Sequence, residues 1–167
     1  MDQKQLTEVA QRMVNGEQPA AIAGLTDTQL KAIAAIGYNQ YQQGRLKDAE
    51  TAFLGLTALD SNNFIGFAGA GAVALAKKPA DLESAFKYLS RAAELKADDA
   101  DIQANLGETL LRMGRLDEAK GHLEKAFQLD PERKDPGVNR ARAIVIGLDA
   151  IVKEATKRKE AQVEKAS

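Results

Sequence analysis

Small residues and leucines recur along the chain with a period near 34 residues, inside stretches whose apolar positions follow helical spacing. Three blocks carry the pattern, each with a glycine, an alanine and a leucine in that order: Gly37, Ala49 and Leu59; Gly71, Ala85 and Leu95; Gly107, Ala119 and Leu129. Such a period is typical of helical repeat proteins. It predicts an all-α superhelix of three stacked helix pairs, and the concave surfaces of such stacks bind other polypeptides.

The spacing has one irregularity. Gly37 and Gly71 are 34 residues apart, whereas Ala49 and Ala85 are 36 residues apart. The two extra residues therefore fall between Gly71 and Ala85, where residues 77–80 read KKPA. We predict that this insertion lies in a turn between two helices, because a longer turn leaves both helical faces in phase.

A separate amphipathic helix of about 13 residues precedes the repeats. Asn15 and Gly16 end it, and residues 19–24 are expected to form a short connector. The apolar stripe of this helix has to be buried on the repeats or on a second copy of the chain; it consists of Leu6, Val9, Ala10, Met13 and Val14.

The repeat array begins at a strong helix start. Thr26 and Gln29 form a capping box, and Leu25 and Leu30 have the spacing of a hydrophobic staple. We expect three parts along the chain. Residues 1–29 form an N-terminal helix and linker that could serve for dimerisation. The three repeats occupy residues 30–63, 64–99 and 100–133, and residues 134–167 form a C-terminal segment.

One more helix is predicted after the array. Asp135 and Pro136 supply an N-cap and a first-turn proline for a helix from about residue 137 to residue 159. Its apolar stripe is expected to cover the exposed core of the third repeat, ahead of a highly charged, frayed tail; the stripe consists of Ala141, Ile144, Val145, Leu148, Ile151 and Val152.

Charge and composition narrow the classes of partner. The net charge is −1, so the chain has no strongly positive field for a phosphate backbone, and nucleic acid is not an expected partner. The absence of cysteine excludes thiolate chemistry and fits a reducing, cytoplasmic environment. The acidic, amphipathic start is unlike a secretory signal, and the longest uncharged run, residues 61–76, is too short to span a bilayer. No direct membrane insertion is expected.

Several residues at these offsets resemble the tetratricopeptide repeat. They are Gly37, Ala49, Phe53, Leu59 and Asp60, then Leu106, Gly107, Gly114, Leu116, Ala119, Ala126, Leu129, Asp130 and Pro131. More narrowly, residues 24–72 resemble the class II chaperones of type III secretion systems, as does the layout of a free N-terminal helix, three repeats and a C-terminal helix ending in the RKxxA-like segment from Arg158 to Ala161.

The resemblance implies a peptide-binding groove lined by the first helix of each repeat. The positions that face inward in this family include Lys31, Ala34, Tyr38, Tyr41, Ile65, Ala68, Ala72, Leu75, Glu108 and Arg112. Tyr38 and Tyr41 match aromatic positions that hold a segment of the client containing proline and leucine. One of the two could instead pack between repeats, and Ala34 stands where relatives often carry a larger aromatic residue.

Other motifs favour structural interpretations. Gly69, Gly71 and Ala74 spell G-x-G-x-x-A inside a predicted helix with no preceding strand, which argues against a dinucleotide site. His122 is the only histidine and is expected to be a solvated surface residue. No arrangement of nucleophile and base is present, so neither an enzyme nor a cofactor or metal site is expected.

The resemblance implies a cytoplasmic chaperone that holds a hydrophobic translocator protein soluble before export. By the same resemblance, the chain is expected to form a homodimer through Leu6, Val9 and Met13. A general tetratricopeptide adaptor between two folded proteins is the alternative, although the version that clamps a C-terminal carboxylate wants polar or basic residues where Tyr38 and Ala72 stand.

Overall fold

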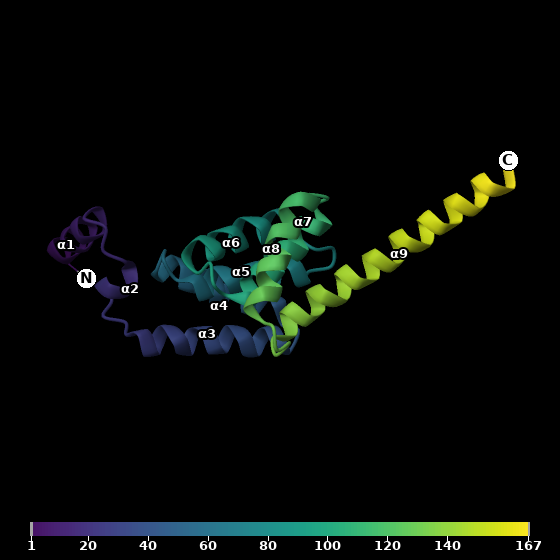
Figure 1. The fold of residues 1–167 in the computed structure, drawn as a ribbon. Coiled ribbons are helices and arrows are strands. Elements are labelled where there is room, and N and C mark those ends of the chain that lie inside the picture. The colour runs from purple at the N-terminus through teal and green to yellow at the C-terminus, as the bar shows by residue number, and fades with distance from the viewer. Residues whose placement is uncertain (1, 167) are drawn as a thin grey trace.

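The computed structural model describes residues 2–166, with side chains through residue 157. Within this range the chain is all-helical, which confirms the predicted fold class (Figure 1). The helices are α1 (Gln3–Val14), α2 (Pro19–Ile22), α3 (Asp27–Gln42), α4 (Leu46–Leu59), α5 (Phe64–Ala76), α6 (Leu82–Leu95), α7 (Ala100–Arg112), α8 (Leu116–Leu129) and α9 (Pro136–Ala166). None of the described helices combines the length and the apolar character that crossing a membrane requires.

Helices α3 to α8 form three consecutive pairs joined by short turns. Residues 43–45 join α3 to α4 and residues 113–115 join α7 to α8, whereas the five residues 77–81 join α5 to α6. The two-residue insertion therefore lies in the turn of the second pair, as the spacing predicts. The capping box of Thr26 and Gln29 also forms at the start of α3.

The recurring glycines mark close contacts between the two helices of a pair. A Cβ atom on Gly71 of α5 would lie 2.5 Å from Cγ of Leu89 in α6. In the next pair, a Cβ atom on Gly107 of α7 would lie 2.6 Å from Cγ of Leu123 in α8. The repeat in the sequence is thus a repeated packing contact, in which a large residue of the second helix fills the space left by a glycine of the first.

Two apolar cores meet at α5. Phe53 and Leu56 of α4 are the largest buried side chains of the first core, beneath α3 and α5. The second core extends from α5 to the start of α9 and includes Leu89 and Leu110. Because buried residues of α5 belong to both cores, the three pairs form one continuous stack.

The N-terminal helix α1 lies at one end of the stack and contacts only α2 (Figure 1). It has no buried residue. The expected connector contains one helical turn, α2, which the side chain of Gln18 attaches to the body by accepting a hydrogen bond of 2.9 Å from the amide of Ser61.

The C-terminal helix α9 is docked only through its first turns. Val138 and Ala141 are buried against α7 and α8, and Ile144 and Val145 are half-buried. Beyond them the helix projects from the body and continues to Ala166, farther than predicted (Figure 1). The expected stripe therefore covers the third repeat only in part, and its exposed members are Leu148, Ile151 and Val152. The segment from residue 158 to residue 161 lies outside the described side chains.

Candidate peptide-binding groove

A groove of about 400 Å³ runs across the first helices of the three pairs and ends against the start of α9. Helix α3 contributes two tyrosines, α5 contributes small and aliphatic residues, and α7 and α9 contribute polar residues. Five of the residues expected to bind peptide lie together in its wall: Tyr38, Tyr41, Ile65, Ala68 and Ala72.

The two tyrosines are held by the core below them. The Tyr38 ring contacts Phe53 edge to face, with 5.3 Å between ring centroids and 79° between planes. The Tyr38 side chain remains 47% exposed, while Tyr41 is half-buried and packs against the first core. Both rings are therefore fixed and still reach the groove, which is the arrangement that favours stacking on an incoming side chain.

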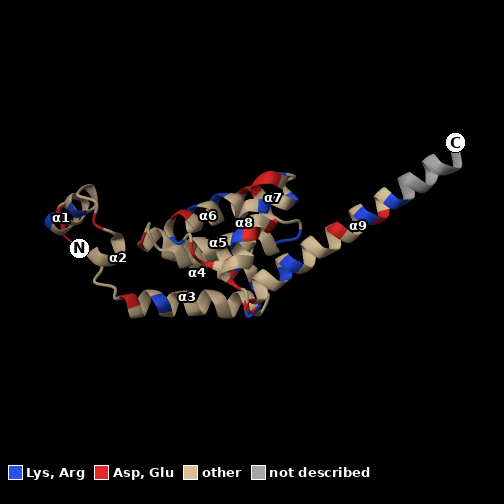
Figure 2. Cartoon of the chain, viewed as in Figure 1, with Lys and Arg blue, Asp and Glu red and all other residues tan. Residues whose placement is uncertain are grey.

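The middle of the groove is hollow because α5 has small side chains there. Ala68 and Ala72 line it, and Gly69 allows Phe53 to approach so closely that a Cβ atom on Gly69 would lie 2.3 Å from Cδ1 of that ring. Helix α5 carries no charged residue, and in α3 the charges are confined to its first turns (Figure 2). This half of the groove offers an apolar surface to a ligand.

In the third repeat, Glu108, which was expected to face the groove, is buried. Glu108 is 1% exposed, because α9 lies over it and Arg140 donates a 2.9 Å hydrogen bond from Nε to Oε2 of Glu108. Arg112 pairs with the other carboxylate oxygen, and Arg140 also donates to Asn105. The prediction that Glu108 contacts peptide is wrong, since this carboxylate is used to bind two arginines of the protein itself.

Three more of the expected residues do not line this groove. Leu75 is 6% exposed and belongs to the second core, so its assignment to the groove is wrong. The face of α5 that includes this position belongs to the core that α5 shares with α6, α7 and α8. Lys31 and Ala34 line a smaller pocket of about 240 Å³ that shares Phe64 and Ile65 with the groove.

Carboxylates gather where α7 and α9 close the groove. Asp99 and Asp135 cap the two helices by accepting hydrogen bonds from backbone amides, and Asp101 lines the same groove. Burial, together with the charges of Asp135 and Asp99, raises the pKa of Asp101 to about 6. Sequence analysis gave Asp135 only a capping role, because its place in the groove depends on how α9 docks.

The residues expected to form a dimer contact lie on the exposed helix α1. Leu6 and Met13 are 51% and 50% exposed, and Val9 is half-buried. His122, expected to be solvated, is instead half-buried and lies 2.7 Å from Gln103 of the preceding helix. The part of the chain that the structure describes contains no group of side chains that could hold a metal ion.

The family model of the tetratricopeptide repeat matches residues 76–144, from the end of α5 to the first turns of α9. No curated protein matches the chain at a significant level.

Solved structures of the same fold include a type III secretion translocator chaperone and two complexes of PcrH. The translocator chaperone SycD of Yersinia enterocolitica is 24% identical, with 78% of this chain and 98% of SycD covered and a TM-score of 0.63. PcrH in complex with the chaperone binding region of PopB is 29% identical over 72% of this chain and 97% of PcrH, with a TM-score of 0.60. PcrH, a protein of Pseudomonas aeruginosa, in complex with the chaperone binding region of PopD is 28% identical over 76% and 96%, with a TM-score of 0.63.

The repeated packing contacts, the family match over residues 76–144 and these likenesses define the class of fold, which is that of the tetratricopeptide repeat. Within that class, it resembles the translocator chaperones of type III secretion over almost their whole length. Its fold is that of binding proteins of the repeat type rather than that of a known enzyme family.

Proposed function

We propose that this protein is a cytoplasmic chaperone that binds a hydrophobic translocator-type protein and keeps it soluble before export. The observation that carries the proposal is the groove in which Tyr38 and Tyr41 face the small residues Ala68 and Ala72. Its support from relatives is that PcrH, 28–29% identical to this chain, is found in complexes with the chaperone binding regions of PopB and PopD.

The groove suits an extended segment of a client with apolar side chains. Rings of Tyr38 and Tyr41 offer flat apolar surfaces, and the hollow beside Ala68 and Ala72 can receive a proline or leucine side chain. Burial of such a side chain contributes about 1.5–3 kcal/mol. Occupation of the groove would lower the concentration of free, aggregation-prone client by mass action.

Residues outside the groove have separate proposed roles. Lys31 and Ala34 extend the binding surface through the adjoining pocket, which meets the groove at Ile65. Arg112 pairs with Glu108 but its side chain remains 45% exposed at the end of α7, and its other N–H groups are proposed to meet an acidic residue of the client. Leu6, Val9 and Met13 of α1 are proposed to form a homodimer contact, because this helix buries none of its residues within one chain.

The experiment measures binding of a fluorescent peptide, the chaperone binding region of PopD, to the wild type and to Tyr38→Ala and Tyr41→Ala variants. Each variant is expected to weaken binding at least tenfold, which corresponds to about 1.4 kcal/mol. Ile36→Ala is the matched control, because Ile36 is 56% exposed on the same helix and does not line the groove.

Co-expression with a candidate translocator that has two long apolar segments provides the second measurement. The wild type is expected to keep that protein in the soluble fraction, and the double tyrosine variant is expected to release it. Unchanged peptide affinity in both tyrosine variants would contradict the assignment of the site. A wild type that solubilises no such client would favour the adaptor instead.

A further inference from the structure

The charged residues that line the peptide-binding groove lie together at one of its ends. Asp99, Asp101 and Asp135 line it where α7 and the start of α9 close it, with Arg140 as the single cation. We call these three carboxylates the acidic end. A Cβ atom on Gly137 would overlap the carboxylate of Asp101, so the start of α9 lies directly against this part of α7. The acidic end is therefore a fixed part of the groove, built from two helices.

The acidic end has no cationic partner among the side chains that the structure describes. Arg140 donates to Glu108 and Asn105 instead, and Lys96 pairs with Asp98. Each of the three carboxylates accepts one hydrogen bond through one oxygen, and no described group donates to its other oxygen. The end of the groove thus offers free acceptors and a negative charge that no described side chain neutralises.

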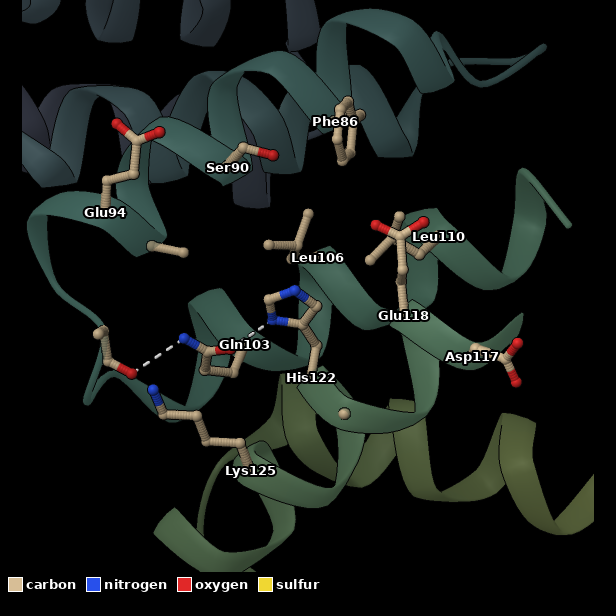
Figure 3. Close-up of a pocket in the computed structure, with 13 residues that line it drawn as sticks. Phe86, Ser90, Glu94, Gln103, Leu106, Leu110, Asp117, Glu118, His122 and Lys125 are labelled. Atoms are coloured by element: carbon tan, nitrogen blue, oxygen red, sulfur yellow. Dashed lines mark hydrogen bonds between the residues drawn. The ribbon is translucent and has the colours of Figure 1, made fainter. Parts of the chain in front are cut away.

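Another hollow of the molecule differs in this respect. It measures about 590 Å³ and lies between α6 and α8, with Glu94 and Glu118 among the residues that line it (Figure 3). Glu94 pairs with Arg91, and Glu118 pairs with Arg115. The other two charged residues of its lining have opposite signs. This second hollow therefore has no excess of charge that would select a ligand, whereas the peptide-binding groove has one.

The environment of Asp101 favours a cation at the acidic end. Burial and the charges of Asp135 and Asp99 raise the pKa of Asp101 to about 6. A positive charge close to such a carboxylate stabilises its ionised form. The three carboxylates do not form a group that could hold a metal ion. A cationic side chain of a bound peptide needs no such group, because it can donate to one or two carboxylates at a time.

The apolar half of the groove meets the acidic end at Tyr38. Burial raises the pKa of Tyr38, and the charges of Asp101 and Asp99 raise it further, so the hydroxyl lies within electrostatic range of both carboxylates. An arginine or lysine side chain has an aliphatic stem and a cationic head, and it can place the two in different surroundings. A cation near the face of a tyrosine ring gains an additional attraction.

We propose that the acidic end binds an arginine or lysine of the client segment. The aliphatic stem of that residue lies on the Tyr38 ring, and its cationic head donates hydrogen bonds to Asp101 and to Asp99 or Asp135. The inference rests on the proposed function of this groove and adds a charge requirement to the apolar one. A client segment then needs a basic residue close to the apolar residue that fills the middle of the groove.

A set of fluorescent peptides tests the proposal. The chaperone binding region of PopD is made with each of its residues replaced in turn by arginine, by glutamine or by glutamate. Fluorescence polarisation measures the affinity of the wild-type protein for each peptide, and scanning every position finds the residue that faces the acidic end. At that position, the peptide with arginine is expected to bind about tenfold or more tightly than the peptide with glutamate, with glutamine between them.

Two double variants show whether that preference arises at the acidic end. Asp101→Asn with Asp135→Asn removes two charges, keeps a hydrogen-bond acceptor at both positions and is expected to abolish the preference for arginine. Asp98→Asn with Asp117→Asn is the matched control, because it changes the net charge equally at two residues that do not line the groove. The control is expected to keep the preference.

Three results would overturn the proposal: no position at which arginine is preferred, a preference that both double variants retain, or a preference that both lose equally. If the unmodified PopD peptide still binds and the tyrosine variants still weaken it, the proposed function is unaffected by any of these results. Failure of the wild type to bind every peptide of the set would instead contradict the proposed function, and this inference with it.

Discussion

At the scale of single residues, the fold depends on glycines that admit a large neighbour. Gly71 and Gly107 are 36 residues apart and meet Leu89 and Leu123, which are 34 residues apart. The difference is absorbed by the longer turn between α5 and α6, so both contacts keep the same geometry. At positions 71 and 107 a residue larger than glycine is excluded because the neighbouring leucine occupies the space, and not because the backbone conformation requires glycine.

Gly71→Ala is therefore expected to lower the free energy of unfolding by about 1–3 kcal/mol, because the new Cβ atom would overlap Leu89. Gly55→Ala is the matched control, since nothing lies within 4 Å of a Cβ atom there. Alanine at position 55 is expected to stabilise the protein by about 0.5–1 kcal/mol through helix propensity. Urea denaturation measures both, and equal effects would contradict this account of the packing.

The carboxylate of Asp101 makes the free energy of unfolding depend on pH. Its pKa in the folded protein is about 6, above the ordinary value, so the folded state binds more protons than the unfolded state between pH 4 and pH 6. Its contribution to stability is therefore present at pH 4 and is lost as the pH rises through 6. Asp101→Asn is expected to raise the free energy of unfolding at pH 7 by about 1–3 kcal/mol and to change it little at pH 4. Urea denaturation at both pH values checks this, and an equal effect at both would contradict it.

At the scale of elements, α9 is attached by two arginines and a short apolar contact. Arg142 lies 3.0 Å from a carboxylate oxygen of Asp130 and also donates to the carbonyls of Phe127 and Asp130. Burial alone would raise the pKa of Asp130, but hydrogen bonds from the Lys134 amide, from Arg142 and from the Asp135 amide lower it. The end of α8 and the start of α9 therefore form one joint.

Removal of the guanidinium in Arg142→Ala is expected to lower the free energy of unfolding by about 2–4 kcal/mol, because the buried Asp130 loses its ionic partner. Amide hydrogen exchange is expected to show faster exchange in the first turns of α9. Arg45→Ala removes an exposed ion pair with Asp48 and should change stability by less than about 1 kcal/mol. Similar losses in the two variants would mean that the joint adds nothing beyond a surface pair.

At the scale of the whole molecule, the stack from α3 to the start of α9 is separate from α1. Deletion of residues 1–17 keeps Gln18 and α2, which attach the N-terminal segment to the body. The free energy of unfolding is expected to change by less than about 0.5 kcal/mol, because α1 buries no residue. Urea denaturation tests this statement, and a larger loss would mean that α1 packs on the repeats in solution. The mass of the same protein tests the proposed dimer contact through Leu6, Val9 and Met13.

The peptide-binding groove shows how far sequence reasoning reaches. Tyr38, Tyr41, Ile65, Ala68 and Ala72 follow from repeat positions, because those positions are set by helical periodicity within each pair. An assignment from repeat position alone puts Glu108 and Leu75 in the groove, because it assumes that every helix pair has the same neighbours. The third pair is instead covered by α9, and Leu75 by the next pair of helices.

The sequence by itself determined the period, the three helix pairs, the place of the insertion and most of the apolar half of the groove. These follow from contacts within a pair, between residues close along the chain. Only the tertiary structure decided that Arg140 covers the third pair, that Asp99, Asp101 and Asp135 line the end of the groove, and that α9 projects from the body beyond its first turns. Those features depend on the direction in which α9 leaves α8, and the joint of Arg142 with Asp130 sets that direction through contacts that no repeat pattern encodes.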